Sequence, residues 1–194
     1  MSKNARLPKI KLELGAGHDS LYIGVAGADI TINAGQGNDS IAIYDAAKAV
    51  VYGGDGNDWL TDYSGHATLF GGAGNDLLTA TGKTTLVGGA GADRFMVMND
   101  WMHNNAAFEV VIKQNDFNPL QGDILDLTGL GSWDNSGFTP LPQDRIFLYH
   151  DDLLITRQDG RVDAIENVGM IALVGISTAI EKGWLVLDAN DGKG

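Results

Sequence analysis

Two ladders of apolar residues run through the first half of the chain, and each advances by one residue fewer at every step. One ladder takes steps of 20, 19, 18 and 17 residues and consists of Leu21, Ile41, Leu60, Leu78 and Phe95. The other takes steps of 19, 18 and 17 residues and consists of Ile32, Val51, Leu69 and Leu86. Because the ladders lie about half a repeat apart, each repeat should hold two short strands separated by two turns. The pattern predicts an all-β parallel solenoid in which equivalent strands pair from coil to coil.

A polar motif precedes every residue of the first ladder. It reads as two small residues, any residue, Gly, any residue, Asp, any residue and an apolar residue. Its good copies are GGDGNDWL (53–60), GGAGNDLL (71–78) and GGAGADRF (88–95), and its slightly weaker copies are AGQGNDSI (34–41) and LGAGHDSL (14–21). The aspartates fall at Asp19, Asp39, Asp58, Asp76 and Asp93. A flexible linker can also be rich in Gly and Asp, but it has no reason to carry apolar ladders in register. The motif therefore predicts ordered, stacked turns.

The second half is predicted to form short strands joined by turns. The candidate strands are 109–113, 124–127, 146–149, 153–157, 170–174 and 184–187, with a hairpin around residues 150–152. Residues 177–183 are a candidate helix, with Ser177 as its N-cap and Gly183 as its stop. A solenoid ending near Phe95 would leave strand edges and an apolar end open. We therefore expect a roll over residues 12–97 and a β-rich cap over residues 98–194.

The tryptophans of the second half have two interpretations. Trp101, Trp133 and Trp184 are expected to be core residues of the cap, and the alternative is a sugar-stacking surface. The basic residues of this half could form a sugar-binding groove, although scattered surface charges are the simpler expectation. They are Lys113, Arg145, Arg157, Arg161 and Lys182.

The net charge of the chain limits the kinds of molecule that it is expected to bind. The formal net charge is −12, and residues 12–93 hold ten acidic residues against two lysines. Such a chain repels phosphates, so nucleic acids and anionic membrane surfaces are poor partners, and cations are favoured ones. The absence of cysteine excludes disulfides and thiolate metal sites. No apolar run is long enough to cross a membrane, and the first residues lack the apolar core of a signal peptide.

The stacked turns have the chemistry of calcium sites. Calcium takes about six to eight oxygen ligands, and glycine allows the sharp turns that aim backbone carbonyls at one point. Residues 12–93 hold 17 of the 27 glycines. One turn cannot surround the ion, but two facing turns can, so five motifs predict about four calcium ions. The carboxylate crowding and the glycine content also predict that the roll is disordered without cations.

The turns on the opposite edge lack the motif. The segment GVAGAD (24–29) leaves Asp29 open as a ligand, whereas Asp45 and Asp62 are expected to be turn or surface residues. His18 lies inside a motif turn, where we expect its backbone, not its ring, to matter. The opposite edge should therefore be closed by ordinary turns.

Signatures of catalysis are missing. The sequence has neither HExxH nor GxSxG, and TGKT (81–84) lacks the glycine that a phosphate loop requires. DANDGKG (188–194) begins like an EF-hand loop but has no closing glutamate. We therefore expect a protein that is not an enzyme.

The five motifs resemble the RTX, or hemolysin-type, calcium-binding nonapeptide repeat over residues 14–97. Residues 109–131 and 164–177 are similar to the capping region that follows the roll in serralysin C-terminal domains and alginate epimerase accessory modules. The resemblance implies a right-handed parallel β-roll in which the five aspartates are carboxylate ligands. It implies export by a type I system, without an N-terminal signal peptide, and folding in extracellular calcium. The implied carbonyl ligands come from Gly35, Gly37, Gly53, Gly54, Asp55, Gly56, Gly71, Gly72, Ala73, Gly74, Gly88, Gly89, Ala90 and Gly91.

Three functions remain open at this point. The leading hypothesis is a noncatalytic, secreted calcium-binding module that folds in calcium after export. The alternatives are a calcium-dependent carbohydrate-binding accessory module that binds polysaccharide, and a fragment of an adhesin or surface layer.

Overall fold

The computed structural model describes residues 8–99, 109–113, 116–130, 132–134, 137–139, 146–150, 152–156, 162–166, 168, 171 and 176–187. The roll contains β1 (Lys9–Ala16), β2 (Ser20–Gly24), β3 (Asp29–Gln36), β4 (Ser40–Tyr44), β5 (Lys48–Asp55), β6 (Trp59–Asp62), β7 (Ala67–Ala73), β8 (Leu77–Ala80), β9 (Thr85–Ala90) and β10 (Arg94–Met98). The later elements are β11 (Glu109–Ile112), β12 (Ile124–Gly129), β13 (Ser132–Asp134), β14 (Gly137–Thr139), β15 (Ile146–Tyr149), β16 (Asp152–Thr156), β17 (Val162–Glu166), α2 (Ile176–Glu181) and β18 (Leu185–Val186).

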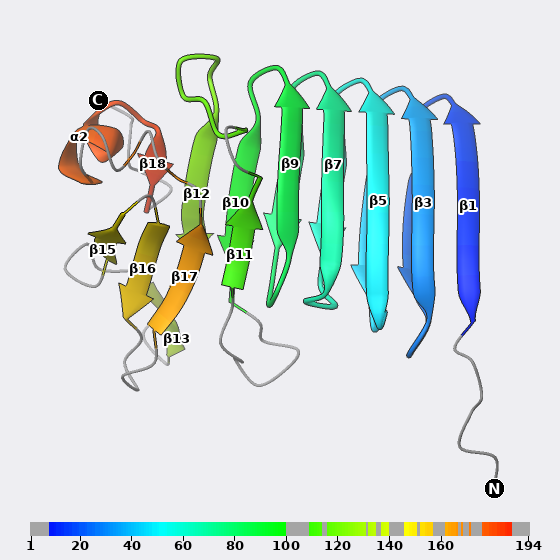
Figure 1. The fold of residues 1–194 in the computed structure, drawn as a ribbon, viewed down its shortest axis with the longest axis horizontal. Helices are drawn as coiled ribbons and strands as arrows, with labels where there is room; N and C mark the ends of the chain where they lie inside the picture. Colours follow the sequence, from blue (N-terminus) through cyan, green and yellow to red (C-terminus); the bar gives the residue numbers. More distant parts are fainter. Residues whose placement is uncertain are drawn as a thin grey trace, which may run out of the picture.

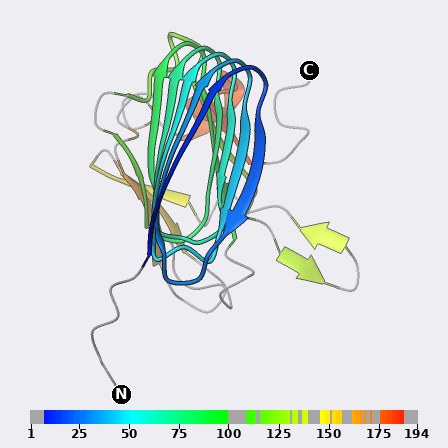
Figure 2. The same cartoon turned by 90° about the vertical axis from the view of Figure 1, so that its right-hand side faces the viewer.

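The predicted parallel β-roll is confirmed. Odd-numbered strands from β1 to β11 pair side by side in one sheet, and even-numbered strands from β2 to β12 pair in the other. The two sheets face each other, so the successive coils overlie one another as flattened loops (Figure 2). Each coil is a strand, a turn, a strand and a second turn, which is the order that the two apolar ladders predict.

The residues of each apolar ladder are paired with one another across neighbouring strands of a sheet. Leu21, Ile41, Leu60, Leu78 and Phe95 are paired in sequence across β2 to β10. Ile32, Val51, Leu69 and Leu86 are paired in the same way across β3 to β9. Every residue of both ladders except Leu21 is almost completely buried. Because side chains alternate between the faces of a strand, this register places the apolar residues between the sheets and the alternate residues outside.

Both ladders extend further than the repeats suggest. Leu12 adds a rung before Ile32, and Ile112 pairs with Leu86. Leu125 pairs with Phe95 and then with Leu185. The two sheets are therefore continuous across residue 97 into the second half of the chain.

The second half extends the larger sheet with strands of mixed direction. β17 pairs parallel to β11, and β16 and β15 follow in antiparallel order. The predicted hairpin around His150 is the β15–β16 pair, with His150 at a positive φ of 57°. The sequence did not predict β17 or the β13–β14 hairpin, which stands apart from the roll (Figure 2).

Two predictions in this half are wrong in detail. Ile171, the described residue of the predicted strand 170–174, is helical, and its N–H donates to the Val168 carbonyl. Ser177 lies inside α2, which starts at Ile176, so it is not the N-cap. Gly183 does stop the helix, since it has a positive φ of 71° and its N–H donates to Ile180.

Trp184 packs partly buried against the core, as the core interpretation predicts. The side chains of Trp101 and Trp133 lie outside the described residues, as do Arg145, Arg157 and Arg161. Within the described part of the chain, no helix has the length and apolar character that a membrane span needs.

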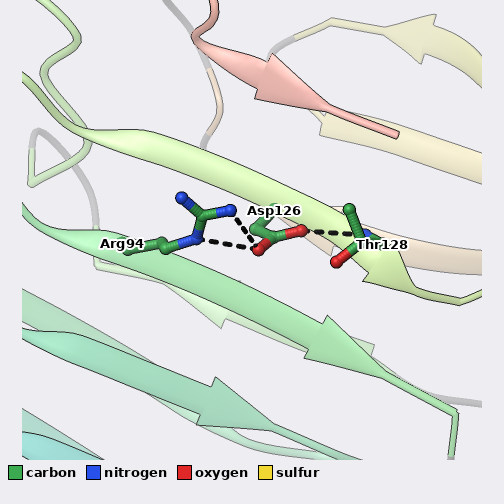
Figure 3. Close-up of polar contacts among 3 residues, drawn as sticks. All are labelled: Arg94, Asp126 and Thr128. Atoms are coloured by element: carbon green, nitrogen blue, oxygen red, sulfur yellow. Dashed lines mark hydrogen bonds and ion pairs between the residues drawn. The ribbon is translucent and has the colours of Figure 1, made fainter. Parts of the chain in front are cut away.

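An ion pair joins the last motif strand, β10, to β12, its neighbour in the same sheet. The guanidinium of Arg94 on β10 contacts Oδ2 of Asp126 on β12 through Nε at 2.8 Å and through a terminal nitrogen at 2.7 Å (Figure 3). Oδ1 of Asp126 accepts the backbone N–H of Thr128 at 2.9 Å. The Asp126 side chain is fully buried, so this pair neutralises a carboxylate that water cannot reach.

Candidate metal centre

The motif turns stack into one column along an edge of the roll. Each turn joins an odd strand to the following even strand, at the arrowhead ends of β1 to β9 (Figure 1). Within the column, each aspartate is tied to the next coil. The backbone N–H of Asp19 donates to Oδ1 of Asp39 at 2.8 Å, and the same bond repeats from Asp39 to Asp58, from Asp58 to Asp76 and from Asp76 to Asp93. All five predicted aspartates are therefore in one line.

The second oxygen of these carboxylates has no protein partner in four of the turns. Oδ2 is buried without a hydrogen bond in Asp19, Asp39, Asp58 and Asp76. A buried carboxylate oxygen without a donor is costly, and native proteins rarely leave one. The four oxygens match the four intervals between the five motif turns. An unmet negative charge that recurs once per interval is what a column of bound cations would neutralise.

Glycine is required here because the coils approach each other through backbone atoms. A Cβ on Gly54, which has a φ of +117°, would overlap the Gly35 carbonyl oxygen of the previous coil. A Cβ on Gly53 would overlap Oδ2 of Asp58 and lie 2.6 Å from the carbonyl oxygen of Gly71. The space that a side chain would fill is therefore lined by carboxylate and carbonyl oxygens, which are the ligands that calcium prefers.

The same arrangement repeats along the column. The glycines of the later motif turns that have a positive φ would, with a Cβ, overlap the carbonyl oxygen of their counterpart one coil earlier. These pairs are Gly35 with Gly15, Gly72 with Gly54, Gly89 with Gly72, Gly37 with Gly17, Gly56 with Gly37, Gly74 with Gly56 and Gly91 with Gly74. Gly71 and Gly88 stand in the same relation to Asp76 and Asp93 as Gly53 does to Asp58.

Three of the backbone carbonyls that are predicted as calcium ligands also accept hydrogen bonds between adjacent coils. The carbonyls of Asp55, Ala73 and Ala90 accept the backbone N–H groups of Gly37, Gly56 and Gly74, at 2.7 to 2.8 Å. A carbonyl oxygen has two lone pairs, so each of them keeps one for a further ligand.

The electrostatics of the column favour a cation. Burial, with smaller contributions from Asp93 and Asp58, raises the pKa of Asp76 to about 7. Burial, with contributions from Asp123 and Asp116, raises the pKa of Asp93 to about 6. Burial also raises the pKa of Asp58. The buried carboxylates are therefore destabilised as anions unless a proton or a metal ion neutralises them.

The column continues for one turn that the motif search missed. The N–H of Asp93 donates to Oδ1 of Asp123 at 2.9 Å, as in the earlier turns. Oδ2 of Asp123, however, accepts the N–H of Asn118 at 2.8 Å. Asp123 stands two residues before Leu125, the same offset that separates Asp93 from Phe95. This offset from the apolar ladder is the signal that could have found it.

Asp116 closes the end of the column. Its Oδ2 accepts the N–H of Gly88 at 2.6 Å, and its Oδ1 accepts that of Gly89 at 3.3 Å. Phe117 then packs edge-on against Phe95 with ring centroids 6.0 Å apart. At this end of the column, backbone N–H groups therefore donate to the carboxylates of Asp116 and Asp123. Four of the earlier motif aspartates have instead an Oδ2 atom without a protein partner.

A second ladder, made of side-chain hydrogen bonds, runs beside the aspartates. In this ladder the later coil donates to the earlier one, whereas in the aspartate column the earlier coil donates to the later one. Oδ1 of Asn38 accepts the N–H of Asn57, Oδ1 of Asn57 accepts that of Asn75, and Oδ1 of Asn75 accepts that of Ala92. His18 begins this ladder, because its Nδ1 accepts the N–H of Asn38 at 2.8 Å. The expectation that only the backbone of His18 matters is therefore wrong. Asparagine precedes the motif aspartate because its short amide reaches the next turn.

The opposite edge has a different chemistry. Asp62 is fully buried and accepts bonds from Ser64 N–H at 2.8 Å, Ala67 N–H at 3.0 Å and Thr84 Oγ1 at 2.7 Å. It is the last residue of β6, and its carboxylate binds the turn that follows, so the expectation of a turn or surface residue is wrong. Asp45 is exposed with a positive φ of 51°, and Asp29 is half-buried at the start of β3.

No point in the described part of the chain brings together three acidic or histidine side chains as a metal site. A cation in the column must therefore take most of its ligands from backbone carbonyls. The unpartnered Oδ2 atoms, the stacked carbonyls and the raised carboxylate pKa values fit calcium in this arrangement.

A family model of the RTX calcium-binding nonapeptide repeat (4 copies) matches residues 52–82 and 78–96. The two matches cover the turns of Asp58, Asp76 and Asp93, together with the strands around them. Comparison with curated proteins gives no match, and comparison with solved structures gives none either.

Proposed function

Because residues 52–96 are RTX calcium-binding nonapeptide repeats, we propose that this protein is a noncatalytic calcium-binding module whose roll folds when calcium binds. The four buried Oδ2 atoms without a protein partner carry the proposal. Asp19, Asp39, Asp58, Asp76 and Asp93 would supply carboxylate oxygens, and the facing glycine carbonyls would supply the remaining ligands. The four intervals between these aspartates would hold about four ions.

The energetics support coupled folding and binding. Residues 12–93 have a formal charge of −8, from ten acidic residues and two lysines, and stacking brings the motif carboxylates together. The 17 glycines of this segment lose more backbone entropy on ordering than other residues would. Calcium would neutralise the column and cross-link adjacent coils, so that binding free energy becomes folding free energy.

Proteins with RTX repeats are typically exported, and export suits this mechanism. A chain that stays unfolded at low calcium can pass a secretion channel and fold in a calcium-rich exterior. The module would then act in the secretion and folding of an exported protein, with type I secretion machinery as its partner.

The test is a calcium titration followed by far-UV circular dichroism, with magnesium as the control ion. We expect a transition from coil to β structure with calcium and none with magnesium at the same concentration. Isothermal titration calorimetry would give the number of ions, for which we expect about four.

Two variants with a matched control make the test specific. The double variant Asp58→Ala and Asp76→Ala should lose the transition or require much more calcium. Asp55→Ala removes an exposed carboxylate three residues from Asp58 but keeps its carbonyl, so it should behave like the original protein. A roll that is complete in chelator and indifferent to calcium would refute the proposal.

A further inference from the structure

On the outer face of the smaller sheet, strands β2, β4, β6 and β8 carry no charge, and the first charged side chain is Arg94 on β10, which is paired with Asp126. The outward positions of β2, β4, β6 and β8 and of the residues that follow the last two strands are Ser20, Tyr22, Gly24, Ser40, Ala42, Tyr44, Trp59, Thr61, Tyr63, Leu77, Thr79 and Thr81. On the opposite sheet, the outward positions include Lys9, Lys11, Glu13, Asp29 and Lys48. An uncharged surface over four strands is unexpected on a chain with a net charge of −12.

Aromatic side chains gather on this uncharged face. Tyr22 is 71% exposed and Trp59 is 55% exposed. Tyr44 and Tyr63 stack with their ring centroids 4.9 Å apart and their planes 13° apart. Tyr44 is paired with Gly24, which lies two residues after Tyr22 on the same face, so Tyr22 lies diagonally beside this stack. We call Tyr22, Tyr44, Trp59 and Tyr63 the aromatic face.

The register arranges these rings around smaller side chains. Tyr22 is paired with Ala42, and Ala42 with Thr61, while Ser40 is paired with Trp59. The row of Ala42 and Thr61 therefore separates Trp59 from the Tyr44–Tyr63 stack. The four aromatic rings come from three successive coils, which repeat about every 4.8 Å, so the aromatic face runs along the axis of the roll.

We propose that the aromatic face binds a neutral polysaccharide. Aromatic rings offer flat apolar surfaces to the C–H faces of sugar rings, and the accessible hydroxyls of Ser20, Ser40 and Tyr22 can both donate and accept hydrogen bonds with sugar hydroxyls. A face without charge matches an uncharged polymer, and the net negative charge elsewhere repels polyanions. A face that runs along the axis of the roll over several coils suits a linear ligand.

The chemistry disfavours the other occupants. Nucleic acids would also stack on aromatic rings, but they need Lys or Arg for their phosphates, and the face has neither. Protein interfaces are enriched in Arg as well as in aromatic residues. The proposal concerns the folded roll and is independent of how many calcium ions bind it.

The test is affinity gel electrophoresis in saturating calcium, with hydroxyethylcellulose, dextran or soluble mannan in the gel and dextran sulfate as the charged control. We expect retardation by at least one neutral polymer and none by dextran sulfate. Trp59→Ala and Tyr22→Ala should each weaken the interaction about tenfold or more. Tyr52→Ala removes a 44% exposed ring from the opposite sheet and should have no effect.

Far-UV circular dichroism in calcium would establish that each variant is folded, and Tyr22, which is largely exposed, can be removed with little effect on the fold. Retardation by none of the neutral polymers would overturn the proposal, and so would equal retardation of the original protein and both variants. Light scattering that shows a dimer lost in Trp59→Ala would also overturn it, because the face would then be occupied by a second copy.

Discussion

The backbone N–H of Asp58 donates to Oδ1 of Asp76 at 2.8 Å, while Oδ2 of Asp76 is buried without a protein partner. One carboxylate therefore has two separate tasks. Oδ1 ties its coil to the previous one, and Oδ2 is left for a cation. Substitutions that affect the two oxygens differently can separate the structural task from the binding task.

Asp76→Asn should impair calcium binding more than it impairs stacking. The amide oxygen can still accept the Asp58 N–H, but the variant has no charge to offer a cation. A lost charged ligand costs about 1.5–3 kcal/mol, which corresponds to roughly a 10- to 100-fold weaker site. Calorimetry with calcium would measure this loss. An affinity equal to that of the original protein would show that the Asp76 carboxylate is not a ligand.

Acidification should stabilise the roll when calcium is absent. The pKa of Asp76 is raised to about 7 and that of Asp93 to about 6, from an ordinary value of 3.8. A carboxyl group with a raised pKa in the folded state holds its proton more tightly when folded, so protonation favours folding. This contribution is complete below pH 3.8 and is lost as the pH rises through about 6 to 7.

Far-UV circular dichroism in chelator from pH 5 to pH 8 would test the sign of this effect. We expect more β structure at pH 5 than at pH 8, where the chain without calcium is expected to be a coil. The double variant Asp76→Asn and Asp93→Asn should show a flatter dependence, because its amides do not titrate. A content of β structure that rises with pH in chelator would contradict the prediction.

The roll could be predicted from the sequence because its coils are nearly identical. The ladder from Leu21 to Phe95 fixes the register, since a slip of one residue would turn every apolar side chain to solvent. The motif aspartates follow from the same register. Which oxygen of each aspartate bonds to the next coil does not follow from spacing, because it depends on the direction in which the side chain leaves its turn.

The second half was harder because it has no repeat. The strands of the β15–β16 hairpin have strong apolar patterns and were predicted, whereas β17 (Val162–Glu166) carries two acidic residues that weaken its apolar pattern. Asp123 was missed because the turn between β11 and β12 replaces the glycine motif with another sequence. Its offset from Leu125 is preserved since the strand pairing, and not the motif, places it.

The Arg94–Asp126 pair should stabilise the junction between the motif repeats and β12. Arg94→Met would leave the fully buried Asp126 carboxylate without its cation. Because Arg94 is partly exposed, we expect a loss of about 1–3 kcal/mol, less than for a pair buried on both sides. Adding Asp126→Asn should recover part of this loss, because a neutral amide needs no counterion.

Calorimetric unfolding of the two variants in saturating calcium would measure the effect. The single variant should melt below the double variant. Identical melting of the single variant and the original protein would mean that the pair contributes nothing measurable.

Gly54→Ala and Gly15→Ala separate the two reasons for glycine in the motif turns. Both residues have a positive φ, +117° for Gly54 and +106° for Gly15, which strains any L side chain by about 1–3 kcal/mol. A Cβ on Gly15 meets nothing within 4 Å, whereas one on Gly54 overlaps the Gly35 carbonyl. Gly15→Ala should therefore lose only the strain energy, and Gly54→Ala should lose several kcal/mol more because adjacent coils must move apart. Urea unfolding at fixed calcium would compare the two, and equal losses would show that contact between coils does not require glycine.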